Sequence, residues 1–308
     1  MTRRARPDAI QALRESTRLG DEQETLEDES IGSVDLTRWR TPAGREAASL
    51  VGRSSKRLGD RGALILTLAI GAAIALGLSF AASRIYDAIT ESDGVAGLDH
   101  PLLQWAMHAR TPLLDTILTG YTDIAGPIGM PILAVAAILF LALRRRSWTP
   151  VILIASAGLG SLLMTVAGKD IIDRDRPPLA DAVPPYEYSP SFPSGHTLNA
   201  IVIAGIVAYL LILRQRKAHA RVLTIVIASV FAATVGLSRV FLGHHWFTDV
   251  LAGWVLGGAW LALVITAHRL YLTTRAQRGA TTTTPQAKDD HGSKEGTHSS
   301  PGEGGVRG

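Results

Sequence analysis

The feature that most constrains this chain is a series of six long apolar runs, which hold nearly all of its hydrophobicity. They cover residues 63–83, 124–143, 149–168, 197–213, 222–237 and 250–267. A helix needs about 20 apolar residues, rising 1.5 Å each, to cross a bilayer, and the last three runs are slightly shorter. Their ends continue into polar motifs, which we expect at the membrane surface. A soluble helical protein does not need six such runs, so the pattern predicts an all-α bundle of six transmembrane helices.

The segments that flank the apolar runs are polar and charged. Residues 1–62 combine an acidic block, DEQETLEDES at 21–30, with a basic one, GRSSKRLGDRG at 52–62. Residues 272–308 are rich in Gly, Ser and Thr. Chains of this composition bury too little apolar surface to fold alone. We therefore expect 1–62 and 272–308 to be disordered tails on either side of a membrane domain at 63–271.

Composition excludes several classes of function. The chain contains no cysteine, which excludes disulfides and thiolate metal sites. Its net charge of +4 is modest and its arginines are scattered, so we expect no nucleic-acid partner. No secretory signal is expected at its start, because the polar residues 1–62 precede the first apolar run. That run is therefore expected to remain in the membrane.

Two short, strongly basic loops set the expected orientation. They are LRRRS at 143–147 and RQRKAHAR at 214–221. The positive-inside rule places both in the cytoplasm, together with both termini of a protein in the cell membrane. The segments that then face outside are 84–123, 169–196 and 238–249. Within the first of them, residues 101–118 have helical apolar spacing, which predicts one amphipathic helix lying along the interface.

Three polar motifs gather in two of the outward loops. They are KDIIDRDRP at 169–177, PSGH at 193–196 and SRVFLGHHWFTD at 238–249. Ionisable residues beside a bilayer cost free energy and are usually functional. The first and third motifs supply three cations, Lys169, Arg176 and Arg239. A lysine with two planar guanidinium groups suits a ligand with several anionic oxygens.

The PSGH motif opens the fourth apolar run. A helix start presents free backbone N–H groups that bind anions. Pro193 and Gly195 permit a tight turn into the helix, and Ser194 can cap the helix or donate a hydrogen bond. Together with the three cations, this motif predicts a phosphate-binding pocket at one end of the bundle.

Two adjacent histidines precede the last apolar run, and their spacing separates them. His245 lies four residues before Asp249, so on a helix the two side chains share a face, whereas His244 lies five residues before it. Asp249 can accept the Nδ1–H of His245 and leave Nε2 free as a nucleophile. His196 can then protonate the leaving oxygen as a general acid. We therefore predict His245, Asp249 and His196 as the catalytic residues.

The ordered set of motifs resembles the signature of the type 2 phosphatidic acid phosphatase superfamily. The pattern K-x6-R-P matches Lys169, Arg176 and Pro177, and P-S-G-H matches 193–196. The pattern S-R-x5-H-x3-D matches Ser238, Arg239, His245 and Asp249. The resemblance covers about residues 98–270 and is most specific over 169–249. Its spacing selects His245 over His244 independently of the helical argument.

The resemblance implies a membrane enzyme that removes phosphate from a lipid through a phosphohistidine on His245. His196 would protonate the departing oxygen, and water would hydrolyse the intermediate. The phosphate oxygens would be held by Lys169, Arg176, Ser194, Gly195 and Arg239. Neither a metal nor another cofactor is implied, because the cations stabilise the transferred charge.

The substrate is expected to enter sideways from the outer leaflet, because no large soluble domain accompanies the bundle. We expect a polyprenyl diphosphate carrier lipid, as for an undecaprenyl diphosphatase, with phosphatidic acid or phosphatidylglycerol phosphate close behind. Two alternatives stay open: a lipid phosphotransferase on the same fold, and a non-catalytic membrane transporter or scaffold. The oligomeric state and the physiological lipid do not follow from the sequence.

Residues near the motifs are assigned more ordinary roles. The Pro-rich segment 177–192 is either a rigid connector or a lid whose Tyr186 and Tyr188 touch lipid chains. We expect Arg174 to lie at the protein surface. His244 is expected to lie beside the site without reacting.

Overall fold

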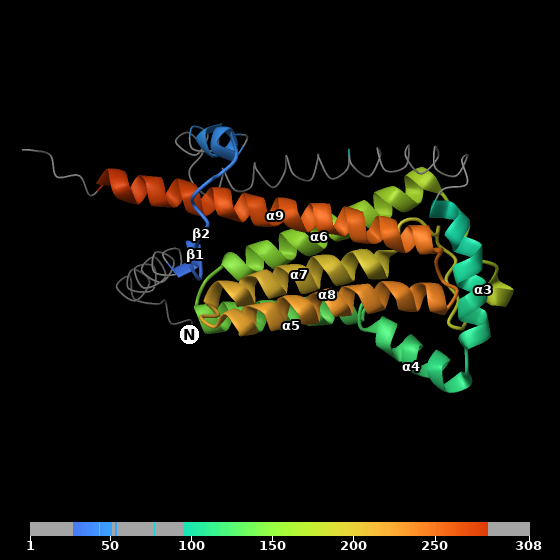
Figure 1. The fold of residues 1–308 in the computed structure, drawn as a ribbon. Helices are drawn as coiled ribbons and strands as arrows, with labels where there is room; N and C mark the ends of the chain where they lie inside the picture. Colours follow the sequence, from blue (N-terminus) through green and yellow to red (C-terminus); the bar gives the residue numbers. More distant parts are fainter. Residues whose placement is uncertain (1–26, 43, 51–52, 54–76, 78–94, 283–308) are drawn as a thin grey trace, which may run out of the picture.

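The computed structural model describes residues 27–42, 44–50, 53, 77 and 95–282 (Figure 1). The first predicted span, 63–83, lies almost entirely outside these residues. The helices in chain order are α3 (Asp99–Ala109), α4 (Pro112–Asp123), α5 (Gly129–Arg145), α6 (Thr149–Ile172), α7 (Gly195–Arg214), α8 (Ala218–Phe241) and α9 (Phe247–Thr282). Short 3₁₀ helices occur at Val95–Leu98 (η1) and Leu179–Asp181 (η2), and β1 (Ser30–Ile31) pairs with β2 (Val34–Asp35).

Four of the described helices are long and apolar enough to cross a membrane. They are α6, α7, α8 and the Phe247–Gln277 part of α9. They correspond to the third to sixth predicted spans, and each is longer than its apolar run because motif residues continue the helix. The second predicted span becomes α5, which has 17 residues and is about 26 Å long. The described part of the chain therefore holds four candidate spans and a shorter apolar helix, and the count of six spans stays a prediction.

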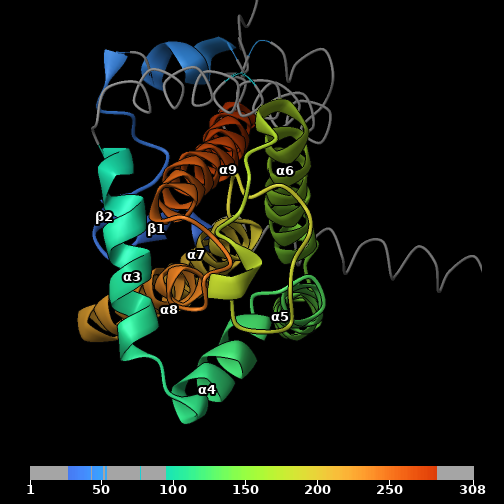
Figure 2. The ribbon, with the colours of Figure 1, turned by 90° about the vertical axis from the view of Figure 1, so that its right-hand side faces the viewer.

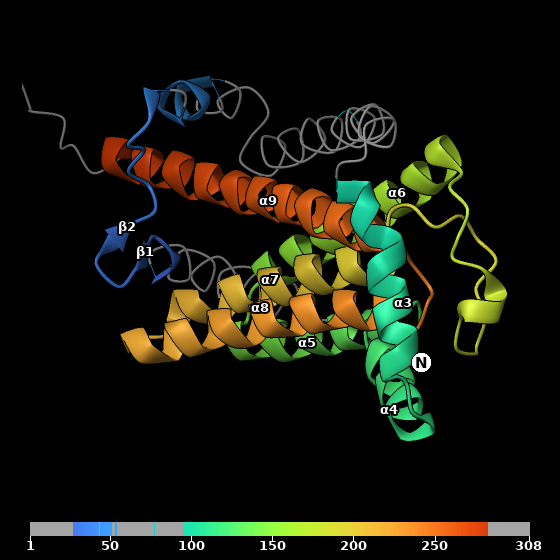
Figure 3. The ribbon, with the colours of Figure 1, turned by 45° about the vertical axis from the view of Figure 1, so that its right-hand side comes forward.

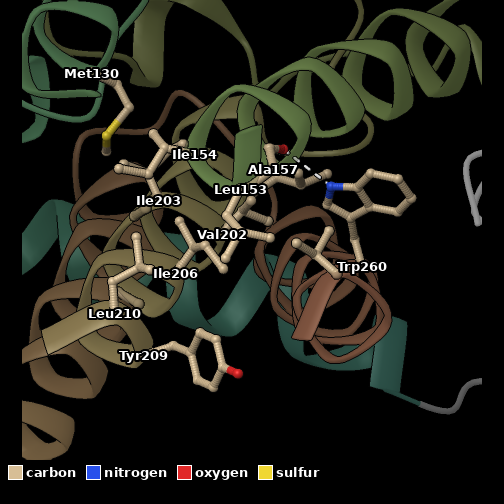
Figure 4. Close-up of a cluster of buried hydrophobic side chains, with 14 of the residues drawn as sticks. Met130, Leu153, Ile154, Ala157, Val202, Ile203, Ile206, Tyr209, Leu210 and Trp260 are labelled. Atoms are coloured by element: carbon tan, nitrogen blue, oxygen red, sulfur yellow. Dashed lines mark hydrogen bonds between the residues drawn. The ribbon is translucent and has the colours of Figure 1, made fainter. Parts of the chain in front are cut away.

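The helix α7 lies in the middle of the bundle, with α5, α6, α8 and α9 around it (Figure 2). Its apolar side chains, such as Ile203 and Ile206, pack against Ile154 of α6 (Figure 4). Trp260 of α9 packs beside Gly160 of α6 and donates its indole N–H to the carbonyl of Ala157 over 3.0 Å. This core fixes the helix ends, and with them the segments that carry the polar motifs.

The outer faces of the bundle remain apolar. Leu139 of α5, Leu159 of α6 and Ile227 of α8 are all exposed, as are many of their neighbours. Exposed apolar surface of this extent is costly in water and favourable in lipid. The bundle is that of a membrane protein.

The prediction of one amphipathic helix over 101–118 is wrong. Two helices, α3 and α4, occupy this region, and the break lies just before Pro112. A residue before proline is disfavoured in the helical conformation, and Thr111 is extended, with φ −140° and ψ 153°. Its hydroxyl then accepts the backbone N–H of Leu114 and caps α4. As a result α3 crosses one end of the bundle, against α8 and α9 (Figure 3).

The expectation of disordered tails needs correction where the structure describes them. The helix α9 continues past 271 to Thr282, and side chains and carbonyls between residues 28 and 39 contact the bundle. Trp39 donates its indole N–H to the hydroxyl of Thr273 over 3.0 Å. The side chain of Asp28 is buried between Arg145 and Arg214. These long-range pairings cannot be read from the composition of the tails.

Candidate active site

Four helix ends meet at the end of the bundle that α3 crosses, and each carries one predicted site residue. Lys169 lies in the last turn of α6, and Arg239 in the last turn of α8. His196 lies in the first turn of α7, and Asp249 in the first turn of α9. Successive helices run in opposite directions, so these four positions come together although they span 81 residues of sequence (249 minus 169, plus one). Arg176 and His245 come from the connecting segments.

His245 lies beside Asp249, although not on a shared helix. It precedes α9, in the turn that leads into the helix, and its Nδ1 is 3.5 Å from Oδ2 of Asp249. The backbone N–H of Trp246 donates to the same oxygen over 3.0 Å and holds the carboxylate at the helix start. The predicted pairing is therefore present, but a turn produces it, and the helical argument for it was wrong.

Ser191, which the sequence did not single out, links these two side chains. Its hydroxyl donates to Oδ2 of Asp249 over 2.5 Å and lies 3.3 Å from Nδ1 of His245. The hydroxyl oxygen can therefore accept the Nδ1–H of the histidine. This assignment leaves Nε2 as the lone-pair nitrogen, which faces Nη1 of Arg176 at 3.2 Å.

The protonation state of His245 follows from its surroundings. Its side chain is buried, and Arg176 and Arg239 lie close to it. Burial, followed by these two positive charges, lowers the pKa of His245 well below its ordinary value. The imidazole is therefore neutral near pH 7, as a nucleophile requires.

Glu187 bridges the two motif arginines. Its Oε2 lies 2.8 Å from Nη2 of Arg176, and its Oε1 accepts from Nη2 of Arg239. Burial raises the pKa of Glu187, but Arg239 and Arg176 outweigh this effect and bring the pKa to about 2. The carboxylate is therefore ionised, and it binds the cations in the way that an anionic ligand would.

The segment that follows Glu187 is held by Lys169 and Arg176. Lys169 donates from Nζ to the hydroxyl of Ser189 over 2.9 Å and to the carbonyl of Pro190. Arg176 donates from Nε to the carbonyl of Ser189 over 2.6 Å. The connector 177–192 is thus fastened over the site by the residues that were predicted to bind phosphate.

A cavity of about 840 Å³ joins the polar site to an apolar groove. At one end it is lined by Lys169, Glu187, His196 and His245. Its other walls are apolar side chains of α5, α6 and α7, namely Met130, Ile138, Ile154, Leu162 and Ile203. The cavity therefore has a charged end of the right chemistry for phosphate and an apolar part suited to a hydrocarbon chain.

His196 closes one wall of this cavity. Its side chain is buried, and the turn between α4 and α5 lies against it. A Cβ on Gly126 would lie only 3.1 Å from Nε2 of His196, so a glycine suits this close approach. The predicted general acid and the predicted nucleophile thus line the same cavity.

His244 lies beside the site as expected, whereas Ser194 does not cap α7. The ring of His244 is turned away from the cavity, and its Nε2 donates to the carbonyl of Val183 over 2.6 Å. Burial and then Arg239 lower its pKa to about 4. Ser194 immediately precedes α7 as predicted, but its side chain does not cap the helix. Its hydroxyl instead accepts from the hydroxyl of Thr197 over 2.9 Å.

Arg174 is not the surface residue that the sequence analysis expected. Its guanidinium donates to Oδ1 of Asp249 over 2.5 Å, to Oδ2 of Asp99 over 2.8 Å and to the hydroxyl of Thr248. One signal could have found it. Arg174 and Arg176 are two residues apart in a non-helical segment, so their side chains can contact different partners.

Comparisons with known proteins give a matching family, a related protein and a similar solved structure. The model of the PAP2 superfamily matches residues 149–271, which contain all three motifs. Phosphatidylglycerophosphatase B of Bacillus subtilis (strain 168) is 35% identical over 178 residues, covering 56% of this chain and 84% of that protein. A solved structure, described as the first transmembrane PAP2 type phosphatidylglycerolphosphate phosphatase from Bacillus subtilis, aligns with a TM-score of 0.51. It is 26% identical, and the match covers 68% of this chain and 98% of that one.

Proposed function

Because this chain belongs to the type 2 phosphatidic acid phosphatase (PAP2) superfamily and is a membrane lipid phosphatase, we propose that it hydrolyses a lipid phosphomonoester through a phosphohistidine on His245. One observation carries the proposal: a single cavity joins the cation and histidine cluster to an apolar groove. A phosphorylated lipid fits such a cavity with its headgroup at His245 and a chain between α5, α6 and α7.

The proposed reaction has two steps. In the first, Nε2 of His245 bonds to phosphorus, the bond from phosphorus to the lipid oxygen breaks, and His196 gives that oxygen its proton. In the second, His196 takes a proton from water, the water oxygen bonds to phosphorus, and the phosphorus–nitrogen bond breaks. Asp249 and Ser191 hold the Nδ1 side of the ring during both steps.

The charge of the transferred phosphoryl group is assigned to three cations, Lys169, Arg176 and Arg239. They surround the polar end of the cavity directly or through Glu187. The backbone at Ser194 and Gly195, at the start of α7, is proposed to contribute N–H donors. Within residues 27–42, 44–50, 53, 77 and 95–282, no three His, Asp or Glu side chains are placed to hold a metal ion. Independence from metals stays a prediction.

We propose phosphatidylglycerol phosphate as the preferred substrate, because both similar proteins carry that activity in their names. The sequence analysis favoured a polyprenyl diphosphate, and that preference stays a prediction. Both lipids carry a terminal phosphate and hydrocarbon chains, so a cavity with a charged end and apolar walls suits either class. Entry from the bilayer is favoured by the position of the groove among apolar helices whose outer faces are exposed.

Purified full-length protein in detergent tests the function. Phosphate release is measured with phosphatidylglycerol phosphate, phosphatidic acid and a polyprenyl diphosphate, each with and without EDTA. We expect release from the first substrate at the highest kcat/KM, without an acceptor lipid, unaffected by EDTA and inhibited by vanadate, which mimics the transition state. His245→Ala should lose about 10⁴-fold or more of the activity. His244→Ala, the matched control, should retain most of it because its ring faces Val183.

Each alternative has its own outcome in this assay. Formation of a phosphorylated acceptor lipid without release of free phosphate would identify a phosphotransferase. Lipid binding without release would identify a non-catalytic protein. Equal loss in the two histidine variants would contradict the assignment of His245 as nucleophile.

A further inference from the structure

Arg174 compensates the charge of the predicted catalytic aspartate. The carboxylate of Asp249 is fully buried, and its Oδ1 is taken by the guanidinium of Arg174, which is itself only 15% exposed. Its Oδ2 is left to Ser191, the N–H of Trp246 and the ring of His245. A buried carboxylate stays ionised only with a partner of opposite charge. Arg174 thus binds Oδ1 of Asp249, while Oδ2 faces the ring of His245.

Asp99, the first residue of α3, holds Arg174 and the start of α9 at once. Its Oδ1 accepts the backbone N–H of Thr248 over 2.9 Å, and its Oδ2 accepts the hydroxyl of Thr248 over 2.7 Å. The same Oδ2 accepts from Arg174 over 2.8 Å. A carboxylate at a helix N-terminus accepts hydrogen bonds from free N–H groups and interacts favourably with the helix dipole. The turn that carries Asp249 is therefore fixed by a helix 150 residues earlier in the sequence (249 minus 99).

We infer that Arg174 is a positioning residue of the reaction, which holds Asp249 against His245 and is in turn held by Asp99. The inference rests on the proposed function, because it requires His245 to be the residue that is phosphorylated. When Nε2 bonds to phosphorus, the ring becomes more positive and its Nδ1–H becomes a stronger donor. A carboxylate in the correct place stabilises that state, and a displacement of about 1 Å can cost on the order of 10²-fold in rate.

Arg174 acts away from the phosphate, unlike its near neighbour Arg176. Neither arginine lines the cavity itself, and the two differ in what they contact: Arg174 pairs with Asp99 and with Oδ1 of Asp249. Arg176 instead contacts Nε2 of His245 and shares Glu187 with Arg239. The two arginines should therefore affect different kinetic constants: Arg174 the rate of the chemical step, and Arg176 the affinity for phosphate.

Three variants of the full-length protein test this division: Arg174→Gln, Arg174→Lys and, as the matched control, Arg176→Gln. The measurements are kcat with dioctanoyl phosphatidic acid and the inhibition constant of inorganic phosphate. Arg174→Gln should lower kcat about 10²-fold and leave the inhibition constant unchanged. Arg174→Lys should recover part of kcat, because lysine keeps the charge but cannot bridge two carboxylates. Arg176→Gln should raise the inhibition constant.

The double variant Asp99→Asn with Arg174→Gln tests whether Asp99 acts through Arg174. If Asp99 acts by holding Arg174, then Asp99→Asn should lower kcat less than Arg174→Gln does. The kcat of the double variant should then be close to that of Arg174→Gln alone. Independent, fully additive losses would contradict this. Unchanged kcat with a lower melting temperature in both Arg174 variants would reduce Arg174 to a structural residue. An increased inhibition constant in Arg174→Gln would make it a phosphate ligand. Wild-type protein that releases no phosphate would instead overturn the proposed function.

Discussion

Each end of the bundle holds two arginines bridged by one carboxylate, and the surroundings of the two bridges differ. At the end opposite α3, Asp28 lies 3.3 Å from Arg145 and 3.1 Å from Arg214. The side chain of Asp28 is 2% exposed, and that of Arg145 is 6% exposed. Asp28 is not among the residues that line the large cavity, whereas Glu187 is. This bridge connects the N-terminal segment to α5 and α7 and has a structural role.

At the other end, Glu187 bridges Arg176 and Arg239 beside the cavity. Its side chain is 30% exposed, and it shares the cavity wall with Lys169 and His245. A carboxylate in this position can be exchanged for another anion, because both the ligand and the released side chain have space. Similar ion pairs therefore serve different purposes, and the difference lies in burial and in what else faces the cations.

The largest expected effect concerns which side of the membrane each end faces. We propose that the Glu187 end is extracytoplasmic and that the basic loops are cytoplasmic. The chain has no cysteine, so Tyr188→Cys and Lys217→Cys, both at exposed positions at opposite ends, can be labelled separately. In intact cells a membrane-impermeant maleimide should label only the Tyr188→Cys variant. Labelling of the Lys217→Cys variant alone would place the active site in the cytoplasm.

An intermediate effect is expected from the exchangeable bridge. A phosphate that binds Arg176 and Arg239 must displace Glu187, so Glu187→Gln should strengthen the binding of phosphate, vanadate and substrate by one common factor, about tenfold. Inhibition constants and KM, measured in detergent, report this factor. Asp181→Asn, in the same connector, is the control. Weaker binding in Glu187→Gln would show that the carboxylate positions the arginines instead.

The smallest effect on activity is expected from the buried bridge. Asp28→Asn leaves Arg145 and Arg214 without their shared counter-ion, which should destabilise the fold by about 3 kcal/mol. The lower melting temperature in detergent would report this. The site lies at the far end of α7, so kcat should stay within about twofold of wild type. A large loss of kcat at a temperature where the variant is folded would mean that the two ends are coupled.

The polar residues that the motifs singled out lie close together in the structure. Lys169, Arg176, His196, Arg239, His245 and Asp249 were all named from their spacing, and the structure brings them together. The choice of His245 over His244 survives even though its helical justification does not, because the turn before α9 brings the ring to the same carboxylate. Whether these residues catalyse the reaction as proposed depends on the experiments above.

The missed residues share one property, which is that their partners are far away in the sequence. Arg174 was assigned to the surface because its partners, Asp99 and Asp249, each lie 75 residues away in the sequence. Ser191 and Glu187 lie in a Pro-rich connector whose pattern fits either a spacer or a lid. The break before Pro112 was the exception, because a proline signal was present there and was not used.

The sequence by itself determined that the chain is helical, that its apolar runs belong in a membrane and which polar residues are the candidates for the chemistry. Periodicity, apolar length and motif spacing are local properties, so they can be read without coordinates. Only the tertiary structure decided how the charges pair: Asp28 and Glu187 on their arginines, and Arg174 between two carboxylates. Charge pairing depends on distances and burial between segments that the fold alone brings together, and these decide whether an arginine binds a ligand or a neighbour.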